Sequence, residues 1–414
     1  MKFLSLVLTA ILLLISGCAQ PDGAVGSSVG TDLNGTTRVI TAPIEADTSY
    51  IAETVSTGSS PYLYVGSAAG VTSSSLLSFD LLGFPPVDSI VTIDAKLSLS
   101  HQGSIGADRG LNVDHKLSNY YWEESDPPSW EELSQVIMDT TFSSISIAED
   151  SASYEVNVPH EWVRSWLRAI EISEADTSAE DTLKSIPLTV SLSAEEPGGI
   201  SSQIVRFRSR GALGDSIKPK LELILGFMSV DSTGSEVMDW DTLSIFPSRD
   251  SYILKHEPID PSENLIVGSG VNFQSNLRFD LSDLWQAQDE FHIVVNRATL
   301  LLHKVPDDDN ILPILLSISP FKLTDSTGFT FPDSAAYAGF AFFSTAIDSA
   351  LDTLQIIVTS PVVDWATGPE FNFGLSLHSS SQGLDINRSA YYSSSHPDPS
   401  MRPRLSIYYT ELVR

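Results

Sequence analysis

The sequence contains a single cysteine, Cys18, in 414 residues. A chain with one cysteine forms no internal disulfide, so its stability must rest on the burial of an apolar core. Basic residues are also scarce, because 23 Lys and Arg stand against 53 Asp and Glu, a formal net charge of −30. This balance argues against nucleic acid as a partner, since binding to phosphates needs Lys and Arg. It favours a surface that an excess of carboxylates keeps soluble.

Long apolar runs are absent after residue 15, so no later segment offers the roughly 20 apolar residues that span a bilayer. The chain has no His-Glu-x-x-His and no Gly-x-x-x-x-Gly-Lys. These motifs would mark a zinc protease and a phosphate-binding loop. The acidic run at 307–310 lacks the spaced ligands and turn glycine of a calcium loop, which favours a solvated turn. We predict a chain without metal, cofactor or enzymatic activity; a carboxylate pair for glycoside cleavage is the open alternative.

The N-terminus carries an export signal. Residues 1–17 contain a lysine, an apolar stretch and a final Ser-Gly, in the order typical of a secretory signal peptide. Residues 15–18 resemble the bacterial lipobox, in which the cysteine is acylated. We therefore expect a signal peptide at 1–17, a lipid on Cys18 and a flexible Gly- and Ser-rich tether over 18–37. The residue after Cys18 is alanine and not aspartate, which favours the outer membrane; an ordinary signal peptide is the alternative.

The rest of the chain repeats itself. Residues 63–82 contain Leu-Tyr-Val-Gly-Ser and Phe-Asp-Leu, and residues 265–284 contain Leu-Ile-Val-Gly-Ser and Phe-Asp-Leu. In both copies apolar residues alternate with polar ones, which predicts β-strands. The halves also end alike, because 186–193 resembles 371–378 and 207–225 resembles 392–409. The period is too long for a solenoid and indicates a duplicated domain.

The same alternation continues between these markers. It predicts strands at 46–51, 91–99, 154–158, 188–192, 298–302 and 354–358. Val163, Trp166, Leu167 and Ile170 have the spacing of one helix face, and Trp365 parallels Trp166 in the second half. We therefore predict an all-β fold of two tandem antiparallel, jelly-roll-like β-sandwiches. Their predicted bounds are 38–226 and 243–411, with a linker at 227–242.

Both halves resemble the DNRLRE domain, a β-sandwich module of bacterial surface and secreted proteins. The resemblance rests on the two repeated runs, the Ala95-Lys-Leu-Ser-Leu strand, the segment 121–130 and the closing Pro219-Lys-Leu-Glu-Leu and Pro403-Arg-Leu-Ser-Ile. It covers roughly 40–226 and 243–411, and it implies domains like carbohydrate-binding modules linked to alginate and related sugars. The second half lacks the Trp…Trp segment and the arginines of Phe207-Arg-Ser-Arg.

Two clusters are candidates for ligand binding. Aromatic rings among acids and prolines can stack on sugar faces, and these are Tyr120, Tyr121, Trp122 and Trp130. Guanidinium groups alternating in one strand can pair with the carboxylate of an acidic sugar, and these are Arg206, Arg208 and Arg210. The alternative is structural: the tryptophans plug the open end of the sandwich, and the arginines pair with the protein's own acids.

Together these features predict a lipid-anchored cell-envelope protein, in the outer membrane and either periplasmic or surface-exposed. Its sandwiches would bind polysaccharide without catalysis. The alternative is a structural or adhesive envelope protein whose domains act as spacers or dock to other envelope proteins.

Overall fold

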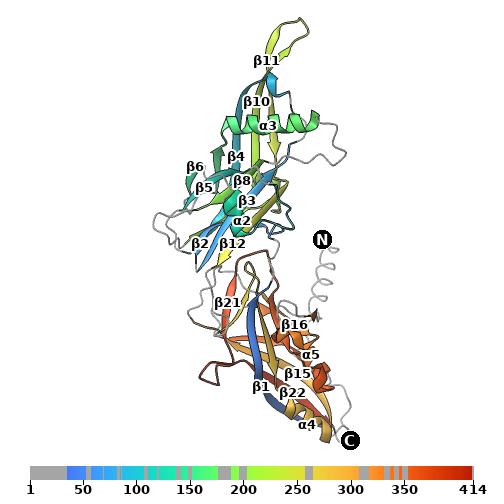
Figure 1. Cartoon of the computed structure of the whole chain (residues 1–414). Coiled ribbons are helices and arrows are strands. Elements are labelled where there is room, and N and C mark those ends of the chain that lie inside the picture. Colours follow the sequence, from blue (N-terminus) through green and yellow to red (C-terminus); the bar gives the residue numbers. More distant parts are fainter. Residues whose placement is uncertain are drawn as a thin grey trace, which may run out of the picture.

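The computed structural model of the chain is all-β and divides into two lobes along one long axis (Figure 1). It describes residues 35–52, 57–68, 70–81, 84, 86–106, 111–118, 121–136, 141–147, 152–175, 188–194, 203–256, 264–306, 317–330, 336–339, 345–346 and 353–412. The predicted signal peptide, Cys18, Tyr120 and the acidic run at 307–310 lie outside the described residues.

The first lobe, called the first unit, comprises residues 62–256. Its strands are β2 (Tyr62–Ala68), β3 (Val71–Phe79), β4 (Ile90–Gly106), β5 (Leu111–Ser118), β6 (Thr141–Ile147), β7 (Ser153–Asn157), β8 (Leu188–Ser193), β9 (Gln203–Arg208), β10 (Lys220–Val230), β11 (Glu236–Ile245) and β12 (Arg249–His256). Its helices are α2 (Trp130–Val136) and α3 (His160–Ala175).

The second lobe, called the second unit, comprises residues 264–412 and one strand from the N-terminus. Its strands are β1 (Thr36–Ile51), β13 (Asn264–Gly268), β14 (Phe273–Phe279), β15 (His292–His303), β16 (Ser317–Leu323), β17 (Tyr337–Gly339), β18 (Thr345–Ala346), β19 (Thr353–Ile357), β20 (Leu375–Ser379), β21 (Arg388–Tyr392) and β22 (Arg404–Leu412). Its helices are α4 (Ser282–Glu290) and α5 (Thr359–Ala366).

The predicted fold class is confirmed. Every strand pair among the described residues is antiparallel. Each unit has its own core: Leu77 and Phe79 lie in the first, and Leu277 and Phe279 lie in the second. The apolar face predicted for the helix at 163–170 is buried in the first core, as part of α3. Burial of alternating side chains therefore sets which face of each strand points into the core of its unit.

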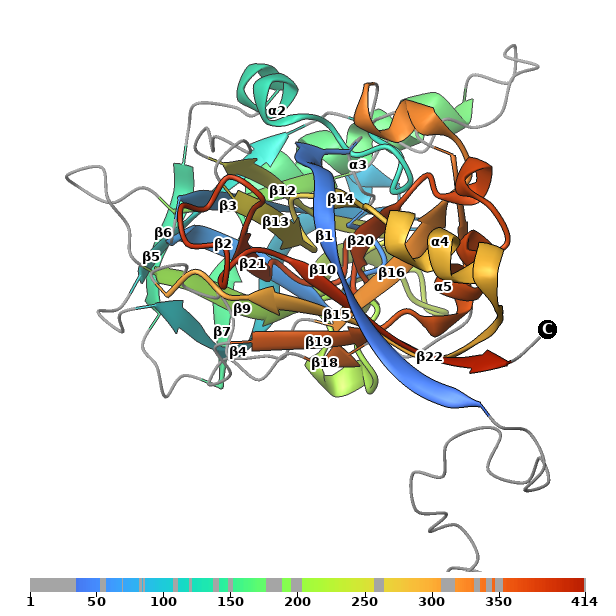
Figure 2. The same ribbon diagram turned by 90° about the horizontal axis from the view of Figure 1, so that it is seen from below.

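The N-terminal strand does not stay with the unit that follows it. Residues 44–51 of β1 pair with β14, and residues 36–43 pair with β22. Figure 2 shows β1 running along the second unit, with β22 beside its outer end. The pairing differs from the sequence-based division, which assigns 38–51 to the first sandwich. Alternation in the sequence predicts a strand here, but it carries no information about which of two similar slots the strand fills.

The corresponding slot of the first unit is filled by strands from the C-terminal end of that unit. β11 pairs with β10 and β12 pairs with β3, so residues 236–256 complete the first unit. The stretch predicted as a linker, 227–242, is therefore the end of β10, a turn and the start of β11. Each unit is closed by the strand that leads into the other unit.

Matching hydrogen bonds show that the two closures are equivalent. Asp250 lies opposite Leu77 in the first unit, as Asp47 lies opposite Leu277 in the second. The carboxylate of Asp250 accepts the backbone N–H of Arg210 at 2.6 Å, and that of Asp47 accepts the N–H of Ser394 at 2.6 Å.

The strand register also corrects the sequence alignment of the last repeat. Leu63 pairs with Phe207 and its counterpart Leu265 pairs with Tyr391, so Phe207 corresponds to Tyr391 and not to Tyr392. The serine side chains that brace these strands agree with this register. Ser75 and Ser275 each donate to the carbonyl of the strand beside them at 2.8 Å.

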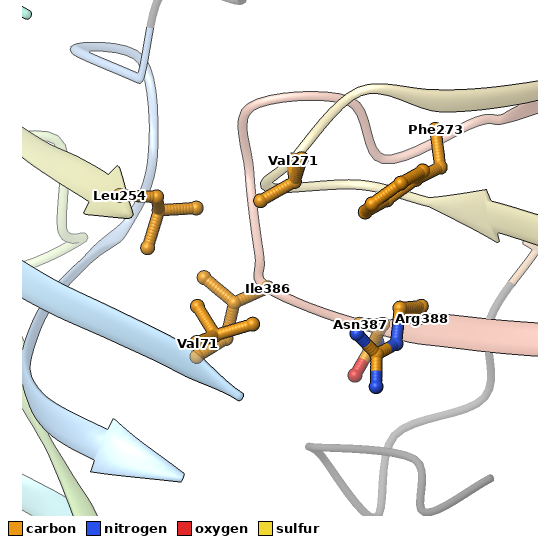
Figure 3. A pocket seen from close by; sticks show the side chains of 7 residues that line it. All are labelled: Val71, Leu254, Val271, Phe273, Ile386, Asn387 and Arg388. Atoms are coloured by element: carbon orange, nitrogen blue, oxygen red, sulfur yellow. The ribbon is translucent and has the colours of Figure 1, made fainter. Parts of the chain in front are cut away.

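The two units meet across a specific seam. The Tyr252 hydroxyl, fully buried on β12, lies 3.0 Å from the carbonyl oxygens of both Gly383 and Asp385 in the second unit. Figure 3 shows apolar side chains facing each other across this seam, Val71 and Leu254 from the first unit and Val271 and Ile386 from the second. Polar anchors and apolar packing therefore hold one arrangement of the units.

Candidate functional site

The aromatic loop, residues 121–130, ends in a capping box. The backbone N–H of Ser129 donates to Glu132 Oε2 at 2.8 Å, and the N–H of Glu132 donates to Ser129 Oγ at 3.3 Å. This reciprocal pair satisfies the first free donors of α2. Hydrogen bonds from the backbone N–H and the side chain of Ser129 lower the pKa of the Glu132 carboxyl. The cap fixes Trp130 as the first residue of α2.

Trp130 lines a cleft of about 480 Å³ at the seam. The first unit contributes the aromatic loop, the start of α2 and the end of β12, and the second contributes the end of β1 and the turn between β13 and β14. The lining residues are Ile51, Ala52, Thr57, 126–132, 252–256 and 270–272. This volume lies within the range of small-molecule sites, roughly 300–1,000 Å³.

The chemistry of the cleft is mixed. Asp126 and Glu131 offer exposed carboxylates on the wall that carries Trp130. Lys255 and His256, at the end of β12, line the same cleft. The His256 ring packs edge-on against Phe273 of the second unit, with ring centroids 5.6 Å apart. An indole, carboxylates and a lysine in one cleft match the needs of a hydroxyl-rich ligand, which offers apolar faces and hydrogen-bonding edges.

The other rings of the loop are used structurally. Trp122 is 3% exposed and packs with Leu76, Leu133 and Ile253. The Tyr121 ring is exposed, but the Arg249 guanidinium lies 4.6 Å from its centroid, and its hydroxyl bonds to Glu123. Trp122 is thus buried in a small cluster separate from the main core of the first unit, and of the predicted rings in the described part of the chain only Trp130 lines the cleft.

The predicted arginine row separates into two parts. Arg206 and Arg208 lie on β9 and flank one ring, with guanidinium carbons 4.8 Å and 5.0 Å from the centroid of Tyr62. Arg206 also donates to the carbonyl of Gln102 at 2.8 Å. Among the described residues neither guanidinium is in an ion pair. This pair therefore offers two positive charges that no described carboxylate pairs with and that cation–π contacts hold.

Arg210 lies beyond the end of β9, in the following turn, so the three arginines do not form one row. Its guanidinium makes a two-point ion pair with Glu124 on the aromatic loop and donates to the carbonyl of Ser248. Arg210 therefore ties the aromatic loop to β12, which is the structural role that the sequence left open.

Sequence reasoning missed the far wall of the cleft. Lys255, His256 and the turn at 270–272 come together only because β12 closes the first unit and leads into the second. The available signal was the Lys255-His256 pair one residue after Ser251-Tyr-Ile, a tripeptide that also occurs at 49–51. Within the part of the chain that the structure describes, no three His, Cys, Asp or Glu side chains are placed to hold a metal ion. No helix there is long and apolar enough to cross a bilayer.

Comparisons with known proteins add little. No family model matches the chain, and no curated protein matches it. Among solved structures, it is similar to the tandem CBM22-1-CBM22-2 domain of Paenibacillus barcinonensis Xyn10C. That match has 8% identity and a TM-score of 0.15, and covers 89% of this chain and 99% of that one. A second match is the infectious bursal disease virus Gx strain structure, with 9% identity, TM-score 0.11 and coverage of 93% and 78%. Such scores carry no argument about fold or function.

Proposed function

We propose that the chain binds polysaccharide without catalysis, through the cleft at the seam. The observation that carries the proposal is the position of Trp130, a half-buried indole fixed by a capping box in a cleft that also holds Asp126, Glu131 and Lys255. An indole face stacks on the apolar face of a sugar, and the charged groups accept and donate to its hydroxyls. An open cleft between two units suits one stretch of a long chain.

The location of the protein is part of the same proposal. The lipobox-like segment ending at Cys18 would anchor the chain by acyl groups in the cell envelope, at the outer membrane. The seam would then be held outside the cytoplasm on a tether, within reach of a cell-surface or periplasmic glycan. The resemblance to DNRLRE domains supports this location and the ligand class.

Affinity gel electrophoresis against acidic and neutral glycans tests the binding. Residues 19–414 retain every described residue and leave out the acylated cysteine. We expect retention by at least one glycan, its loss in Trp130→Ala, and full retention in Trp240→Ala, a matched change at an exposed tryptophan away from the cleft. Absence of retention on every glycan, or equal retention by Trp130→Ala, contradicts the proposal.

A specific observation favours the alternative role in protein docking. The hairpin of β10 and β11 presents an apolar strip on one face, with Trp240 61% and Val230 69% exposed and Met228 directly opposite Met238. Apolar strips of this kind mark contact surfaces. Crosslinking in whole cells discriminates between the roles: a reproducible protein neighbour lost in Trp240→Ala supports docking, and no such neighbour counts against it.

A further inference from the structure

The closing strand of the second unit comes from a distant part of the chain. β1 joins two groups of strands in the second unit's sheet, β17-β16-β20-β14 on one side and β22-β15-β19 on the other. Without β1, both β14 and β22 would present open edges along the slot, and unpaired edges favour pairing with another chain. The slot is therefore a strand-binding site that this molecule fills with its own N-terminal strand.

Side chains make the slot selective for β1. Ala42 is fully buried in the second core, and Ile40 and Ile44 pack against the same cluster. Ser49 Oγ lies 2.7 Å from Ser275 Oγ and accepts the backbone N–H of Ile266 at 3.0 Å. These contacts specify register as well as composition, because a one-residue slip would move the apolar residues to the solvent face.

Nothing in these contacts requires both partners to belong to one chain. The residues that β1 touches are more than 200 positions away, and β1 is the first strand of the described chain, so it enters the slot without threading a loop. We propose that the slot between β14 and β22 also accepts β1 of a second copy, which gives a reciprocally strand-exchanged dimer. Every backbone pair of the monomer is kept in that dimer, so only effective concentration favours the monomer.

The second connection between the units limits the shape of this dimer. Residues 257–263 join β12 to β13 and reach at most roughly 28 Å when extended. After an exchange, the first unit of each copy contacts the second unit of the other, so the two seams must lie within this reach of each other. The proposal is a closed dimer of two copies, in which each copy fills the slot of the other.

Two single-cysteine variants test the exchange. Residues 19–414 contain no cysteine, so Ser49→Cys in one chain and Ser275→Cys in another supply the only thiols. The two proteins are unfolded together, refolded over a range of concentrations and oxidised. We expect a disulfide-linked heterodimer whose fraction rises with concentration, to about one tenth at 0.1 mM if the effective concentration is on the order of 1 mM.

The controls separate exchange from chance contact. The double variant Ser49→Cys/Ser275→Cys should close within one chain, which shows that the pair is competent. A mixture of Ser49→Cys with Ser75→Cys, the matched position in the first unit, should give no heterodimer. Equal heterodimer from both mixtures, or none from the first at any concentration while the double variant closes, overturns the proposal.

Discussion

The two units are closed alike but differ on the face turned away from the core. At four matched positions of the paired strands β2–β9 and β13–β21, the first unit has Tyr62, Tyr64, Arg206 and Arg208, and the second has Asn264, Ile266, Ala390 and Tyr392. The residues that hold the closing strands agree instead, as Asp250 with Asp47 and Ser75 with Ser275. The comparison teaches that the repeat preserves the closing strands, while the aromatic and arginine side chains considered for ligand binding lie in the first unit and at the seam.

The largest expected effect tests the aromatic loop, which the second unit lacks. Trp122→Ala leaves a cavity beside Leu76, Leu133 and Ile253 and should lower the free energy of unfolding by about 3–5 kcal/mol. Trp130→Ala, at the half-buried neighbour in the cleft, should cost markedly less. Thermal melting of both variants checks this, and equal losses would contradict the assignment of Trp122 to packing and Trp130 to the cleft.

The next effect tests whether the closing strands β1 and β12 couple the unfolding of the two units. Leu77→Ala and Leu277→Ala truncate matched, fully buried side chains, and each should cost about 2–5 kcal/mol. Because β1 and β12 each connect one unit to the other, we expect one calorimetric transition that both variants lower. Two transitions, each shifted by only one of the variants, would show that the units unfold separately.

A third prediction concerns pH and Asp250. Burial raises the pKa of Asp250 from 3.8 to about 7. The folded state then holds a proton that the unfolded state releases, so stability is full below about pH 4 and is lost as the pH rises through about 7. The difference in pKa corresponds to at most about 4 kcal/mol.

Urea unfolding of Asp250→Asn between pH 4 and 8 checks this. The variant keeps an acceptor for the Arg210 N–H. Its free energy of unfolding should not fall as the pH rises, so it should be more stable than the parent at pH 8. Asp47→Asn in the second unit serves as the matched change. A decline of the same size in parent and Asp250→Asn would mean that another group is responsible.

The smallest effect on stability is expected at the arginines. Arg206→Ala and Arg208→Ala should each change the free energy of unfolding by less than about 1 kcal/mol, because neither breaks an ion pair among the described residues. Arg210→Ala removes the two-point pair with Glu124 and should cost about 1 kcal/mol, since both side chains are partly exposed.

The effect of each arginine variant on glycan binding should distinguish Arg206 and Arg208 from Arg210. If an acidic glycan is retained, Arg206→Ala and Arg208→Ala should weaken it more than they weaken a neutral glycan, whereas Arg210→Ala should not discriminate between the two. Affinity gels with both glycans measure the difference. Equal weakening of acidic and neutral glycans would remove any role for the positive pair in selecting charge.

Much of the fold follows from local patterns. The alternation over 91–99 predicts β4, and the spacing from Val163 to Ile170 predicts the buried face of α3, because burial has the period of each element. The destination of β1 does not follow, since its alternating pattern suits both slots. Trp122 and Trp130 show the same limit within the site: both lie among acids and prolines, yet one is buried and the other lines the cleft.

A choice between two disulfides in residues 19–414 directly measures which unit β1 pairs with in the monomer. Ser49 on β1 lies opposite Ser275 in the second unit, and Ser75 is the matched position in the first. We expect Ser49→Cys/Ser275→Cys to oxidise to an internal disulfide in the folded monomer, and Ser49→Cys/Ser75→Cys to remain reduced. An internal disulfide in the second variant and free thiols in the first would place β1 in the first unit and contradict the account.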